Sequence, residues 1–172
     1  MRNATLTLAL ACLAACTTAC TDDTGDESSD EFGVDEDDIA SDAADYASYE
    51  RITATSLPSQ HGLAATVHVW VPADVEADYR ALDPADPDAS ASFEPGTLLI
   101  KEHLDAEGMP AGLTVMFKGE PGYDPDSGDW WWGNLAVDGT INDSGAISYC
   151  IDCHGPRSGA DWVFGVAAAD QS

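Results

Sequence analysis

Alternating and β-branched apolar positions, interrupted by Gly and Pro, dominate the chain after about residue 50 and predict a strand-rich fold. Five segments carry this pattern: 51–57, 63–71, 96–104, 111–118 and 129–137. Turn residues separate them, as in Glu94-Pro95-Gly96. One segment, 73–82, instead spaces Val75, Tyr79 and Leu82 at helical intervals. The pattern predicts an α+β fold, mainly an antiparallel β-sheet with one or two packed helices.

A different pattern begins the chain: one Arg, an apolar run from Leu6 to Ala15, then small residues. This is the layout of a secretory signal, and the run is too short to span a bilayer. Leu13-Ala14-Ala15-Cys16 resembles the lipobox of bacterial lipoproteins, in which the Cys is lipidated. We expect a signal peptide at 1–15, a lipid anchor on Cys16, and a location facing the periplasm or cell exterior. An ordinary secreted protein, cleaved nearby, is the alternative.

Charge separates the next segment from the rest. The chain has 32 acidic against 6 basic residues, a net charge of −26, and residues 22–50 hold 13 of the acids but no Lys or Arg. Such a segment buries too little apolar surface to offset chain entropy, and its charges repel one another. We expect an acidic, disordered tether at 16–50 and a folded domain at 51–172. The acid surplus also excludes nucleic-acid binding and leaves the lipid as the only link to a membrane.

A five-residue motif, Cys150-Ile151-Asp152-Cys153-His154, carries the clearest chemistry. C-x-x-C-H is the attachment site of c-type haem, in which each thiol adds to a vinyl group and the His becomes the proximal ligand of iron. The predicted export fits, because such haem is attached outside the cytoplasm. The motif predicts one covalent haem c, held by Cys150 and Cys153, with His154 as the axial ligand.

Two other roles of a C-x-x-C pair remain as alternatives. A thioredoxin-like redox pair expects a βαβ context, which is not visible upstream of Cys150. A zinc site needs further ligands, and His61, His68 and His103 stand isolated in the sequence.

The position of the motif discriminates among haem proteins. Small electron-carrier cytochromes begin with C-x-x-C-H and supply a distal Met later, whereas here 18 residues follow His154 and none is Met or His. Met109 and Met116 precede the motif, which is the wrong order for that fold. A strand-rich domain with a late motif predicts five-coordinate iron with an open distal face, suited to binding or converting a small molecule.

Residues 49–167 resemble the cytochrome P-460 family and its relatives, the β-type cytochromes c′. The resemblance lies in Gly-Thr-x-x-x-Lys-Glu at 96–102, Gly112-Leu113, Gly-Asp-Trp-Trp-Trp at 128–132, the haem motif, and Asp-Trp-Val-Phe at 161–164. It implies a small antiparallel sheet with helices, one haem, and often a homodimer. The name-giving members oxidise hydroxylamine with a lysine cross-linked to the haem, and that lysine falls on Lys101 here.

Thr114 departs from the family pattern. After Gly-Leu, the hydroxylamine oxidases carry a carboxylate that relays protons above the haem, whereas a Thr hydroxyl passes a hydrogen bond but holds no proton near neutral pH. Glu102, Asp129 and His103 are candidates for the missing base. Strand alternation places Lys101 and His103 on one face and Glu102 on the other, without showing which face meets haem. An exposed strand lysine is therefore the alternative for Lys101.

Five further residues have candidate roles. Trp130 to Trp132 alternate along a strand and are expected in the core and in a dimer interface, with packing at the haem edge as the alternative. Asp161 is a candidate for orienting His154. Arg157 is a candidate partner for a haem propionate, or else a solvent-exposed Arg.

Together these features predict an exported haem protein that oxidises hydroxylamine or a related small nitrogen compound and passes the electrons to another cytochrome. The acidic surface predicts that this electron acceptor is basic. Two alternatives stay open: a non-catalytic binder of nitric oxide or another diatomic gas, similar to the β-type cytochromes c′, and a simple electron carrier.

Overall fold

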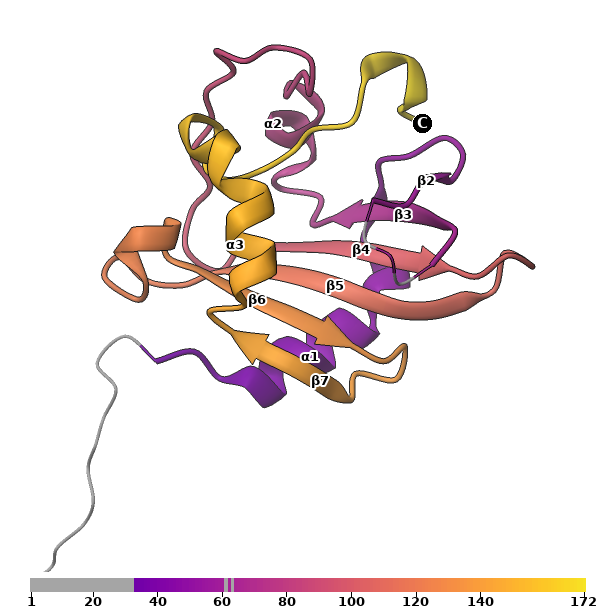
Figure 1. Cartoon of the computed structure of the whole chain (residues 1–172), viewed down its shortest axis with the longest axis horizontal. Helices are drawn as coiled ribbons and strands as arrows, with labels where there is room; N and C mark the ends of the chain where they lie inside the picture. The colour runs from indigo at the N-terminus through magenta and orange to yellow at the C-terminus, as the bar shows by residue number, and fades with distance from the viewer. Residues whose placement is uncertain (1–32, 61, 63) are drawn as a thin grey trace, which may run out of the picture.

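One antiparallel sheet organises the part of the chain that this computed structural model describes, residues 33–60, 62 and 64–172 (Figure 1). Its strands are β1 (Glu50–Arg51), β2 (Leu57–Pro58), β3 (Thr66–Val71), β4 (Leu98–Leu104), β5 (Pro110–Lys118), β6 (Trp130–Leu135) and β7 (Ile141–Gly145). They run in the order β1-β3-β4-β5-β6-β7, with β2 also pairing to β3, and every pairing is antiparallel. The predicted signal peptide at 1–15 and the predicted lipidation of Cys16 lie outside the described residues.

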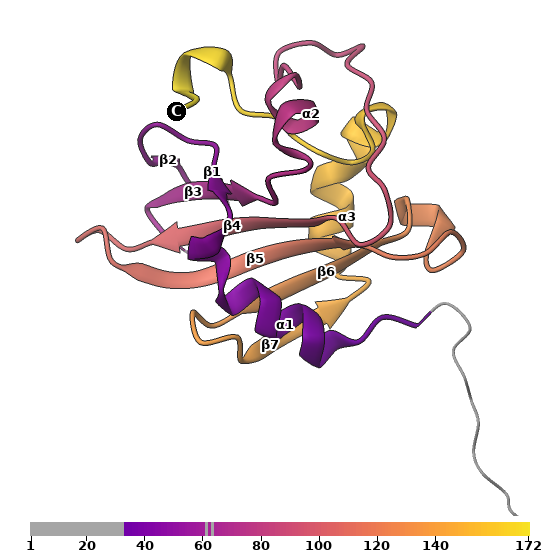
Figure 2. The same ribbon diagram turned by 180° about the vertical axis from the view of Figure 1, so that it is seen from behind.

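Helices cover both faces of the sheet. The α-helices are α1 (Glu36–Ala44), α2 (Glu76–Arg80) and α3 (Ser148–His154), and short 3₁₀ turns occupy Tyr46–Ser48, Pro125–Ser127, Gly155–Ala160 and Ala168–Asp170. Helix α3 crosses one face of the sheet, whereas α1 lies on the opposite face (Figures 1 and 2). None of the described helices is long and apolar enough to cross a bilayer. The mainly antiparallel sheet with a few helices confirms the predicted α+β class.

The sequence pattern predicted most of the strands of the sheet. The predicted strands at 63–71, 96–104, 111–118 and 129–137 correspond to β3, β4, β5 and β6. The predicted strand at 51–57 is wrong in its middle, because only its two ends pair with β3 as β1 and β2. The helix predicted at 73–82 forms over a shorter range, as α2. Strand β7 went unpredicted because INDSG is a polar edge strand with no buried face to impose alternation.

The three tryptophans of β6 divide between the two faces. Trp130 and Trp132 pack on the α3 side with Val69, Leu99 and Met116. Trp131 packs on the α1 side, in the cluster that includes Leu98, Ile100, Leu113 and Val115. All three indoles are exposed by 2 % or less, which confirms their assignment to the core. Their assignment to a dimer interface is wrong, because the chain itself buries them.

Helix α1 corrects the predicted tether. Residues 36–50 belong to the fold, whereas the sequence prediction placed 16–50 in a disordered segment. The average composition of this segment hides a stripe of Ile39, Ala40 and Ala43, which is buried against the sheet. Its acids suit a helix N-terminus: Asp35 caps the helix by accepting from the Asp38 amide at 3.1 Å. Glu36 accepts from Trp131 Nε1 at 2.9 Å and from Ser144 Oγ at 2.9 Å, which ties the helix to the sheet.

We expect Ile39→Ala to lower the free energy of unfolding by about 2–5 kcal/mol, because it leaves a cavity between α1 and the sheet. Asp37→Ala, at an exposed position of the same helix, is the matched control and should cost less than about 1 kcal/mol. Urea unfolding of both variants measures the difference. Equal stability of the two variants would mean that residues 36–44 do not pack on the sheet.

Candidate functional site

A mainly apolar cavity of about 310 Å³ lies between α3 and the sheet. The sheet supplies its floor with Val69, Leu99, Lys101, Thr114, Met116 and Trp132. Helix α3 and the segment after it supply the opposite wall with Tyr149, Cys150, Cys153, His154, Val163 and Phe164. Five residues singled out from the sequence therefore line one space: Lys101, Thr114, Cys150, Cys153 and His154.

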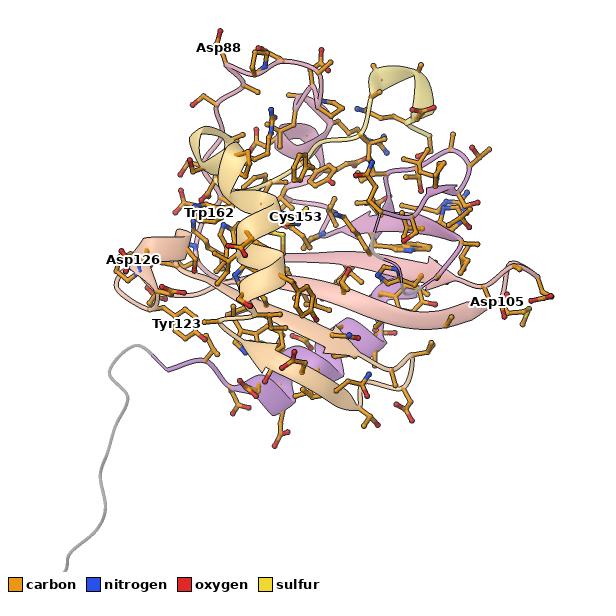
Figure 3. The ribbon with its side chains drawn as sticks, viewed as in Figure 1. Asp88, Asp105, Tyr123, Asp126, Cys153 and Trp162 are labelled. Carbon is orange, nitrogen blue, oxygen red and sulfur yellow. The ribbon has the colours of Figure 1, made fainter. Side chains whose placement is uncertain are left out.

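The two cysteines lie three residues apart on α3, so their side chains share one side of the helix; Figure 3 labels Cys153 on this helix. Both are free thiols; Cys150 is half-buried and Cys153 is exposed. Burial raises the pKa of the Cys150 thiol to about 11; the nearby Lys101 charge opposes this shift, and Cys153 and Asp143 add to it. This shift disfavours the thiolate, whereas the reactive thiol of a redox C-x-x-C pair has a lowered pKa.

His154 ends α3 as a buried, neutral imidazole. Its Nδ1 lies 2.6 Å from the Trp162 carbonyl oxygen. Because a carbonyl only accepts, Nδ1 carries the proton and the lone pair of Nε2 stays available to a metal. Burial lowers the pKa of His154 to about 4, the Lys101 charge adds to the shift, and the hydrogen bond to Trp162 opposes it. The ring packs edge-to-face between Trp132 and Phe164, with centroids 4.8 and 5.1 Å away.

The neighbours of His154 differ from the sequence assignments. The Asp161 carboxylate bonds to Lys118 Nζ at 2.6 Å, so the direct partner of His154 is the Trp162 carbonyl and not Asp161. Arg157 is buried, which rules out the exposed alternative, and its guanidinium donates to the backbone carbonyls of Asp86 and Asp83. Sequence reasoning missed the Trp162 contact because a backbone carbonyl leaves no signal in residue type.

Lys101 extends into the cavity from β4 and pairs across the sheet with Thr114 on β5. The face of β4 that carries Lys101 and His103 is thus the α3 face, which alternation alone left undecided. Among the described residues the ion pairs are Arg80–Glu76 and Lys118–Asp161, so Lys101 has no carboxylate partner there. Burial lowers the pKa of Lys101, with Cys153 and Cys150 opposing the shift. The exposed-lysine alternative is wrong, and an amine less readily charged is a better nucleophile.

His103 lies directly behind Thr114. Its Nε2 shares a hydrogen bond of 3.0 Å with Thr114 Oγ1, and its side chain is 1 % exposed. The other two candidates for the missing base lie elsewhere. Glu102 faces α1 and accepts from Tyr46 and Trp70, and Asp129 accepts from the amides of the loop before β6.

The burial of His103 predicts acid-sensitive stability. Burial, followed by the Lys101 charge, lowers the pKa of His103 from 6.5 to about 4. The unfolded chain therefore takes up this proton first, and the contribution to stability, present above pH 6.5, is lost as the pH falls towards 4. The free energy of unfolding should drop by up to about 3 kcal/mol over this window.

The share of this pH dependence that comes from His103 should be lost in His103→Gln, whereas the share of His154, whose pKa is also lowered to about 4, should remain. Urea unfolding at several pH values between 4 and 7 compares this variant with the wild type. A variant whose pH dependence has the same slope as that of the wild type would show that His103 does not titrate in this way.

Comparison of the chain with models of known protein families, with curated proteins and with solved structures found no match. The resemblance noted above thus rests on the residues and spacings of this sequence.

Proposed function

We propose that this chain is an exported c-type haem protein of the cytochrome P-460 kind, with one haem in the cavity between α3 and the sheet. The observation that carries the proposal is the convergence of both cysteines, His154, Lys101 and Thr114 on that cavity. These residues come from the consecutive strands β4 and β5 and from α3, which follows much later in the sequence.

The cavity suits a covalent haem in three respects. Two thiols lie on one side of α3, available for thioether bonds to the vinyl groups. The Nε2 lone pair of His154 is suited to the iron, because Nδ1 is occupied by the Trp162 carbonyl. The lining is mainly apolar, as a porphyrin requires. A haem held there would supply ligand binding and electron transfer, and the remaining steps belong to residues of the chain.

Lys101 and the Thr114–His103 pair are proposed to serve the substrate side. Lys101 offers an amine inside the cavity for a cross-link to the macrocycle, as the family resemblance implies. Oxidation of hydroxylamine releases protons as well as electrons, and Thr114 Oγ1 can accept a proton while its own proton passes to His103 Nε2. With a pKa near 4, His103 is a weak base that would relay a proton onward and not keep it.

A second function has its own support. None of the described residues that line the cavity is Asp or Glu, so the carboxylate base of the hydroxylamine oxidases has no direct replacement there. This favours a non-catalytic binder of nitric oxide or another diatomic gas. A simple electron carrier is a third candidate, because Met116 lines the cavity floor and could supply a sixth ligand.

The proposed setting follows from the sequence. A lipid on Cys16 would hold the domain at a bacterial membrane, facing the periplasm or cell exterior. The domain would pass electrons to a basic cytochrome, and high salt should slow this transfer because it screens the attraction between opposite charges.

One assay separates the three functions. The purified holoprotein is mixed with hydroxylamine and a basic c-type cytochrome, and the reduction of that cytochrome is followed optically. We expect hydroxylamine-dependent reduction together with a five-coordinate ferrous spectrum. Nitric oxide binding without reduction would support the gas-binding function, and a six-coordinate ferrous spectrum would support the electron carrier. Either result would overturn hydroxylamine oxidation.

A further inference from the structure

The turn that follows α3 has an unusual backbone. Asp161 and Trp162 both adopt left-handed conformations, with φ of 51° and 65°. Residues with side chains rarely adopt this region, and two in succession persist only where the surroundings fix them. This backbone conformation directs the Trp162 carbonyl oxygen at His154 Nδ1, which lies 2.6 Å away. Trp162 lies beside α3 in Figure 3.

A partly buried ion pair holds this turn. Asp161 Oδ1 lies 2.6 Å from Lys118 Nζ, and the two side chains are 11 % and 13 % exposed. The other carboxylate oxygen accepts from the Phe93 amide at 2.8 Å. The Asp161 carbonyl accepts from Trp130 Nε1 at 2.9 Å. Asp161 is thus bonded to three parts of the chain: the loop before β4, the end of β5 and the start of β6.

Lys118 and Gly128 complete the arrangement. Lys118 Nζ also donates to the Gly128 carbonyl at 2.8 Å and lies 4.9 Å from the centre of the Trp130 ring. Gly128 packs against Trp162 so closely that an added Cβ would lie 2.6 Å from the indole. The sheet therefore fixes both the backbone and the side chain of the turn that carries the acceptor of His154.

Stability alone does not account for this pair. Burying two charges costs desolvation that their attraction repays only in part, so a buried ion pair is weak evidence of a stabilising role. Groups behind a metal-binding His, by contrast, fix its tautomer and raise its basicity. The Trp162 carbonyl is such a group, and the ion pair sets where it points.

We propose that Lys118 and Asp161 are positioning residues for His154: they hold the Trp162 carbonyl on Nδ1, keep Nε2 unprotonated and directed to the iron, and so strengthen the iron–histidine bond. This inference rests on the proposed haem site. It assigns the Asp of the 161–164 motif, and a lysine at the end of β5, a role that acts through the backbone.

The test is the iron–histidine stretching frequency of the ferrous holoprotein, measured by resonance Raman spectroscopy in the wild type and Asp161→Asn. We expect a lower frequency in the variant and a reduction potential shifted upward, because a less basic imidazole stabilises ferric iron less. Glu76→Gln removes a partner of the Arg80–Glu76 pair and is the matched control, with an unchanged frequency. A folded Asp161→Asn holoprotein with the wild-type frequency would overturn the proposal.

Two further measurements keep the proposal testable. If Asp161→Asn does not fold, Lys118→Met replaces it, because this variant keeps the bonds of Asp161 to Phe93 and Trp130. Lys118→Met should lower the iron–histidine frequency to a smaller degree. An unchanged frequency would count against the proposal. If the wild type carries no covalent haem, the proposed function fails, and the ¹⁵N shifts of His154 then test the turn itself. The proposal is supported if His154 is a single Nδ1–H tautomer in the wild type and a mixture of tautomers in Lys118→Met. It is overturned if the ¹⁵N shifts of His154 are the same in both proteins.

Discussion

Replacing Cys150 and Cys153 together with Ser should abolish covalent haem attachment. The two thiols are the proposed attachment atoms of the C-x-x-C-H motif, and Ser offers no sulfur for a thioether bond. After extraction with acidified acetone, the wild-type polypeptide should keep its haem absorbance, whereas the double variant should keep none. Each single variant should retain one bond and a correspondingly altered vinyl signature in the pyridine spectrum.

Asp152→Asn provides the control for this experiment. Asp152 is exposed and lies between the two cysteines on α3, so its substitution disturbs the same helix without removing a sulfur. It should keep full attachment. A double variant that still carries haem after extraction would show that the haem is attached elsewhere, and the assignment of α3 as the attachment helix would be wrong.

Lys101→Ala should convert the ferrous spectrum to that of an ordinary c-type haem and lower hydroxylamine oxidation by at least about 100-fold, a loss of the size expected when a group acting in the transition state is removed. The structure supplies the reason: the amine lies in the cavity opposite α3 and has no carboxylate partner among the described residues. Lys101→Arg should behave like Lys101→Ala, because Arg keeps the charge but lacks a nucleophilic amine.

Leu99→Ala separates the chemistry of the amine from the packing of the cavity. Leu99 occupies the same face of β4 and lines the same space, so its truncation enlarges the cavity and leaves the nitrogen in place. This variant should lose stability but keep the spectrum of the wild type. If Lys101→Ala also keeps that spectrum, Lys101 is not cross-linked and gas binding becomes the better account of the site.

The C-x-x-C-H motif could be recognised in the sequence because its five residues are contiguous and chemically specific. The face of β4 that meets the cavity could not, because helices cover both faces of the sheet and nearly every residue of the strand is buried. Period-two alternation identifies a core face only when the other face is polar. His103 therefore emerged as the neighbour of Thr114 only from the pairing of β4 with β5.

Helix α1 escaped prediction for a related reason. Its segment is dominated by acids, and a composition argument averages over the single apolar stripe of Ile39, Ala40 and Ala43 that docks it. The turn at Asp161 and Trp162 could not be predicted from the sequence either, because left-handed backbone at residues other than Gly depends on tertiary contacts such as the ion pair with Lys118. Local patterns thus predicted the strands, whereas contacts between distant segments determine the site.

The mass of the denatured wild-type protein, produced in a cell that attaches c-type haem and treated with a thiol-alkylating reagent, tests the central claim most directly. We expect a mass that exceeds that of the processed polypeptide, with its lipid on Cys16, by one haem, and we expect Cys150 and Cys153 both to be unreactive to the reagent. The mass of the polypeptide without haem, with both cysteines alkylated, would contradict it.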